Sequence, residues 1–80
     1  MLMSATSAVT HNLEFKRFVV RDISDQYEAP TFDLIFRDLE HGVERCSDSV
    51  WSSREQASLA AEALEKADRR PVHWGVLKSL

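Results

Sequence analysis

The chain has 80 residues and a formal net charge of −3, with 10 lysine and arginine residues against 13 aspartate and glutamate residues. This length predicts one domain, and the acidic balance argues against general binding to nucleic acid or to an anionic membrane surface. No apolar run approaches the roughly 20 residues of a membrane-spanning helix, and the single cysteine excludes an internal disulfide, so we expect a cytoplasmic domain stabilised by packing alone.

The first twelve residues, 1–12, are rich in Ser, Thr and Ala and predict a flexible tail in front of a single domain at 13–80. Either Met1 or Met3 could serve as the natural start. The domain opens with a predicted strand at 13–23, which contains Phe and Val and lacks Gly and Pro. Its apolar residues do not alternate strictly, so we expect either a bulge near Lys16 or a strand with apolar residues on both faces.

The next two predicted strands are joined by a tight hairpin. A polar connection at 24–30 leads into the clearest strand, 31–39, in which apolar residues alternate with polar ones. Residues 40–42 predict a short loop, with Gly42 in the left-handed conformation. The third strand, 43–51, is weaker because it contains Ser and Asp, so we expect it at an edge of the sheet or with a bulge.

The segment 52–71 predicts a helix with clear signals at both ends. Ser52 and Ser53 are each followed three residues later by Glu or Gln, which is the reciprocal capping pattern of a helix start. Pro71 is expected to end the helix. A stripe that is mostly alanine allows close approach to a sheet, and Glu65 is expected to pair with the arginine four residues later.

The final segment, 72–80, predicts a fourth strand, with Val72, Trp74 and Val76 on one face. The element order is strand-strand-strand-helix-strand. We therefore predict an α+β fold: a four-stranded, mainly antiparallel sheet with one helix on one face. The handedness of a helical crossover predicts that the fourth strand lies parallel to the third, and pairing with the first strand is one possible arrangement.

No motif in the chain predicts catalysis or cofactor binding. Cys46 lacks a helix start or a neighbouring glycine that would mark a nucleophile, so it reads as a small strand residue. Three histidines lie about thirty residues apart, without the spacing of a metal site. We therefore predict a non-enzymatic protein with no metal, no cofactor and no small-molecule substrate. The histidines are His11, His41 and His73.

A single helix can cover only one face of a four-stranded sheet, so we expect an open face that carries apolar residues. Such a face, flanked by exposed aromatic side chains, is typical of a contact surface. The two tryptophans have an alternative role, which is to close the ends of a small core. The candidate partner-binding residues are Phe15, Val19, Tyr27, Ile35, Trp51 and Trp74.

These observations favour a protein-interaction module whose partner is another protein or a second copy of the chain in a homodimer. It would act as a stoichiometric inhibitor or an adaptor. The alternative is a small nucleic-acid-binding regulator that uses the face of the first two strands. Interspersed aspartates would weaken the positive potential of its basic residues. Those basic residues are Lys16, Arg17, Arg21 and Arg37.

The order of strands, then the helix sequence SSREQASLAAEAL at 52–64, then a last strand resembles HicB-like antitoxin domains and short phage or mobile-element proteins. The chain is also similar in size and acidity to some anti-CRISPR inhibitors. The resemblance covers 31–77 and is architectural, so it carries no functional residue over to this chain. The Gly/Pro-containing loop and the appended DNA-binding element of HicB-like chains are missing. The resemblance implies, in its most specific form, a phage-encoded inhibitor.

Overall fold

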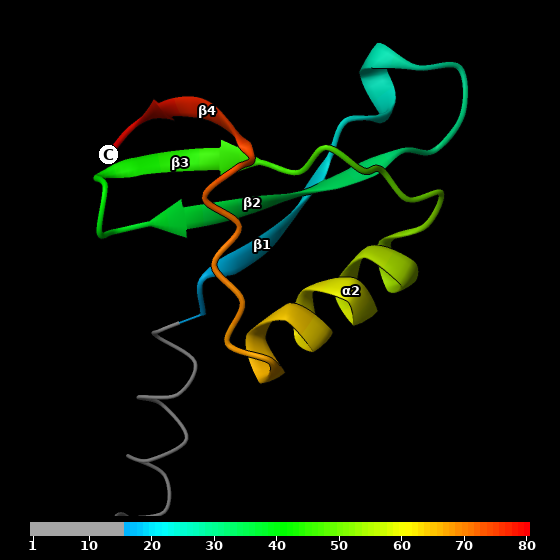
Figure 1. Cartoon of the computed structure of the whole chain (residues 1–80). Coiled ribbons are helices and arrows are strands. Elements are labelled where there is room, and N and C mark those ends of the chain that lie inside the picture. The colour runs from blue at the N-terminus through cyan, green and yellow to red at the C-terminus, as the bar shows by residue number, and fades with distance from the viewer. Residues whose placement is uncertain (1–15) are drawn as a thin grey trace, which may run out of the picture.

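The computed structural model of the chain describes residues 16–80, in which four strands and one α-helix follow the predicted order (Figure 1). This confirms the α+β class. The expected tail at 1–12 and the first part of the expected first strand lie outside the described residues. The elements are β1 (Phe18–Asp22), a short 3-10 helix η1 (Ser24–Gln26), β2 (Phe32–Asp38), β3 (Val43–Cys46), α2 (Arg54–Lys66) and β4 (Gly75–Ser79).

The strands form one sheet in the order β1-β2-β3-β4, and each neighbouring pair is antiparallel. The expectation that the fourth strand lies parallel to the third, or beside the first, was therefore wrong. The helix α2 runs back from the end of β1 to its start, and the connection 67–74 then recrosses the sheet (Figure 1). The connection includes residues 72–74, which were expected to form the start of the last strand. β4 therefore begins later, beside Cys46 at the end of β3.

The core lies between the sheet and α2, on the side where the connection 67–74 also runs. Leu34 is fully buried at its centre, and Phe18 stacks on Phe36 with ring centroids 5.1 Å apart. Trp74 packs edge-on against Phe18 at 6.0 Å, so it is part of the core, as in the alternative role predicted for it. The core cluster comprises Phe18, Phe32, Leu34, Phe36, Ala57, Ala61 and Trp74.

A side-chain cap marks the start of α2, whereas a left-handed backbone conformation marks its end. Ser53 Oγ accepts a hydrogen bond from the backbone N–H of Gln56 at 3.1 Å, which confirms the predicted capping. The helix stops at Lys66, well before Pro71. Asp68 takes the left-handed conformation with φ 54°, and the next N–H bonds back to Leu64 O at 3.0 Å, in a Schellman motif. The expectation that Pro71 ends the helix was wrong.

The β2–β3 hairpin confirms the left-handed glycine, since Gly42 has φ 68°. β3 is only Val43–Cys46, and it lies inside the sheet rather than at an edge; the expected irregularity occurs where its pairing with β4 shifts register between Glu44 and Arg45. After β3, Ser47 uses its own hydroxyl to accept the N–H of Leu34 at 3.0 Å. A side chain thus replaces a strand carbonyl there, and the regular ladder ends.

Asp38, at the end of β2, is a buried carboxylate with several partners. Its Oδ2 accepts from Arg45 Nε at 2.9 Å and lies 2.9 Å from His41 Nδ1, while its Oδ1 accepts from the His41 N–H at 3.1 Å. Burial opposes its ionisation, but the bonds from Arg45 and His41 outweigh burial and lower the pKa of Asp38. Arg45 Nη1 also donates to the carbonyl of Trp74 at 3.1 Å, which fastens the returning connection to the sheet.

Trp74→Ala should destabilise the fold by roughly 3–5 kcal/mol, because it empties the largest part of the core that the sheet shares with the connection 67–74. The matched control is Val76→Ala, two residues later and 59% exposed, which should change the free energy of unfolding by less than about 0.5 kcal/mol. Urea denaturation followed by far-UV circular dichroism measures both. Similar losses in the two variants would contradict a core position for Trp74.

Asp38 should make the protein sensitive to acid. Since its folded-state pKa lies below the unfolded value of about 3.9, its contribution to stability is present above that value and is lost as the pH falls through the folded-state pKa. The free energy of unfolding of the native chain should therefore fall more steeply from about pH 5 downward than that of Asp38→Asn. Urea melts at a series of pH values test this, and parallel curves for the two proteins would disprove it.

Candidate interaction surface along the first strand

The outer edge of β1 has no strand beside it within residues 16–80. Backbone groups of an antiparallel strand point alternately toward the partner and away from it. Val19 and Arg21 direct theirs to β2, as the flanking bonds Arg37 N–H to Arg17 O and Ile23 N–H to Thr31 O require. The N–H and C=O groups of the alternate residues, which include Val20 and Asp22, therefore point outward.

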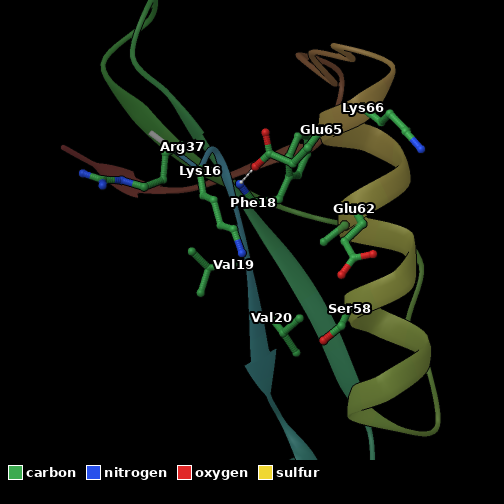
Figure 2. A pocket seen from close by; sticks show the side chains of 10 residues that line it. Lys16, Phe18, Val19, Val20, Arg37, Ser58, Glu62, Glu65 and Lys66 are labelled. Atoms are coloured by element: carbon green, nitrogen blue, oxygen red, sulfur yellow. Dashed lines mark hydrogen bonds between the residues drawn. The ribbon is translucent and has the colours of Figure 1, made fainter. Parts of the chain in front are cut away.

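Glu65 of α2 covers the beginning of this edge. Its Oε2 accepts the backbone N–H of Arg17 at 2.6 Å. The same oxygen accepts the backbone N–H of Phe18 at 2.9 Å (Figure 2). The guanidinium of Arg17 adds an ion pair to Asp68 at 2.8 Å, just past the end of the helix. The expected pairing of Glu65 with Arg69 is replaced by this attachment of α2 to β1. Beyond Phe18, the outward backbone groups of β1 have no such cover from α2.

A groove of about 910 Å³ runs along this edge, between β1 and α2. Figure 2 shows Ser58 and Glu62 of α2 pointing toward Val20 of β1, while Val19 points to the other side of the strand. Small side chains on the helix, at Ser58 and Ala61, leave space over Val20. The groove is lined from the sheet by Lys16, Phe18, Val19, Val20 and Arg37, and from the helix by Ser58, Ala61, Glu62, Glu65 and Lys66.

The two edges of the sheet differ in how open they are to another strand. β4 has a register shift in its pairing with β3, begins with Gly75 and carries Lys78, and irregularity and lysine are features that discourage edge-to-edge pairing. β1 pairs with β2 in unbroken register over the five residues Phe18–Asp22, without Gly, Pro or Lys. β1 is thus the edge at which a further strand can be added.

The open face of the sheet, opposite α2, is less apolar than expected. Arg21 forms a bidentate pair with Asp33 at 3.0 and 2.7 Å, and these hydrogen bonds are the main cause of a raised pKa of Arg21. Ile35, in the middle of this face, is only 7% exposed, whereas Val19 is 50% exposed. On this face, β1 contributes one exposed apolar side chain, Val19, beside its free edge.

The structure does not bring the six candidate partner-binding residues together. Trp74 and Ile35 are buried, and Trp51 is half-buried where it forms a bridge with Phe32. Tyr27 is 52% exposed in the loop after η1, and Phe15 lies outside the described residues. Of the five that lie within the described residues, Val19 alone lines the groove.

Sequence reasoning missed Val20 and the helix residues that face it. A signal existed, since Ser58, Ala61, Glu62 and Glu65 share helical spacing and form a stripe beside the alanines of the core. What the sequence did not indicate is that β1 lies under this stripe.

The described residues offer little for other kinds of site. Asp38, Glu40 and His41 lie within 4.8 Å of one another, but Asp38 is already bonded to Arg45, and Cys46 is a half-buried free thiol. No helix within 16–80 is long and apolar enough to cross a membrane.

Comparisons with protein-family models, curated proteins and solved structures found no match. The β1 edge and its groove are therefore the candidate functional site.

Glu65→Ala should destabilise the fold by about 2 kcal/mol, because it leaves two backbone N–H groups of the strand without a charged acceptor. Amide hydrogen exchange should also accelerate at Phe18. The control is Glu62→Ala, one turn earlier and exposed in the same groove, which should change stability by less than about 0.5 kcal/mol. Equal effects of the two substitutions would show that Glu65 does not hold the strand.

Proposed function

We propose that this protein is a non-enzymatic interaction module that binds a protein partner by strand addition along β1. The observation that carries the proposal is the regular edge of β1, which no strand within residues 16–80 pairs with, beside a groove. In strand addition, an extended segment gains affinity from main-chain hydrogen bonds and specificity from pockets that accept alternate side chains. The outward N–H and C=O groups of Val20 and Asp22 supply the first requirement.

The groove supplies the second requirement. Side chains of an added strand alternate between the two sides of the sheet. On the helix side they meet Val20, Ser58 and Ala61, a combination that suits a small apolar side chain. On the open side they meet Val19 with Lys16 and Arg37 nearby, which favours an acidic or apolar neighbour.

The nucleic-acid alternative has weaker support, because its arginines have carboxylate partners. Arg17 pairs with Asp68 at 2.8 Å and Arg21 with Asp33 at 2.7 Å. Arg37, on the same sheet face as Arg21, lies 3.7 Å from a carboxylate oxygen of Glu44. These pairs neutralise most of the positive charge that a phosphate backbone would require.

The most specific form of the proposal is a phage-encoded stoichiometric inhibitor of anti-CRISPR type that acts in the cytoplasm. Small size, acidity and element order support this form, and no individual residue does. In such an inhibitor, β1 would extend a sheet of the target protein and occupy the surface that the target uses.

Photo-crosslinking in cells of the source organism tests the proposed function. Benzoylphenylalanine placed at Val19, which is 50% exposed at the groove, should yield a covalent adduct with a protein, either another chain or a second copy. Val50 is 51% exposed and does not line the groove, so the same probe there is the matched control and should yield no adduct. The absence of any protein adduct at Val19, or equal adducts at both positions, would reject the β1 edge as the interaction surface.

A further inference from the structure

Resting on the proposed function, we infer that the strand added to β1 is an acidic segment of another protein, with a carboxylate side chain opposite Val19 and a small uncharged side chain opposite Val20. The segment lies antiparallel to β1 and bonds to the outward N–H and C=O groups of Val20 and Asp22. The charges on the two sides of the groove favour this occupant, because they differ in sign.

The open side of the sheet, beside the β1 edge, exposes positive charge. The Arg37 side chain is 50% exposed, whereas the carboxylate that it pairs with, Glu44, is 19% exposed and lies one strand further from the edge. The Arg21 side chain is 35% exposed, whereas Asp33 beside it is only 5% exposed. Each arginine is thus more accessible than its carboxylate, and exposed Lys16 adds a third cation at the head of the groove.

These three cations and two carboxylates leave one excess positive charge on the open side. The helix side has the opposite sign, since Glu62 and Glu65 stand against Lys66. An added strand directs alternate side chains to the two sides, so a carboxylate is attracted on the open side and repelled on the helix side. One carboxylate matches one excess charge, whereas a phosphate backbone brings a long run of charges.

The position opposite Val19 brings a carboxylate close to these cations. The backbone groups of Val19 bond to β2, so toward an added strand it is a non-hydrogen-bonded position, where opposite side chains lie closest. From there Arg21 is a diagonal neighbour within reach of a long side chain. Asp33 accepts from Nε and Nη2 of Arg21, so Nη1 can donate to a second carboxylate. Figure 2 shows the Lys16 side chain extending along β1 toward Val19.

Nuclear magnetic resonance titration with two synthetic peptides tests this inference. The probe is the blocked peptide TVTAEATVT, and TVTAQATVT replaces its glutamate by glutamine. Both should shift the Val20 and Asp22 amides of the native chain, and the glutamate peptide should bind about fivefold more tightly, as one partly exposed ion pair allows. Lys16→Gln should lower this preference by at least about twofold. Lys78→Gln, on the same face but beside the other edge of the sheet, is the matched control and should keep it.

The covalent adduct formed by benzoylphenylalanine at Val19 provides a second readout, which requires no chosen peptide. Mass spectrometry should locate the crosslink in a segment of another protein, with an aspartate or glutamate within two residues of the crosslinked position. A glutamate peptide that leaves the Val20 and Asp22 amides unshifted, equal binding of the two peptides, or a full preference retained by Lys16→Gln would each overturn the inference. An adduct with a second copy of this chain, or with a segment that lacks an acidic residue, would overturn it and leave the proposed function intact, whereas the absence of any adduct would reject both.

Discussion

The guanidinium group of Arg45 connects the parts of this fold that the chain order alone would not bring together. It is 12% exposed and bridges the buried carboxylate of Asp38 and the main-chain carbonyl of Trp74. A buried ion pair is costly unless its members are fully hydrogen-bonded, and here both the acid and the base have additional partners. The bridge ties β2 and β3 to the connection that returns from α2, so it fixes where the last strand begins.

The free edge of β1 follows from this arrangement. Because the connection ends beside Cys46, β4 extends the sheet at β3, and the opposite edge has no neighbouring strand in the described part of the chain. α2 lies over β1 and β2 on the core side, and Glu65 reaches only the first two amides of that edge. The position of the groove is therefore a consequence of the core packing of Trp74 and of the length of α2.

The elements could be predicted from the sequence because each is specified by nearby residues. Ser53 with Gln56 starts the helix, and Gly42 permits the hairpin. The order of strands could not be predicted, since it depends on contacts between Arg45 and a carbonyl 29 residues later. The candidate site was foreseen only at Val19, because Glu65 meets β1 across 47 residues of sequence and no local pattern encodes that contact.

Asp68 combines two roles with opposite requirements. Its left-handed backbone, φ 54°, is a conformation in which a residue with a Cβ is less stable than glycine by about 1 kcal/mol, yet its carboxylate binds Arg17 at 2.8 Å. Glycine would relax the turn and lose the anchor, and a longer acid would keep the charge and strain the turn further. Thermostability engineering at this position would therefore trade helix termination against the attachment of the strand that carries the binding edge.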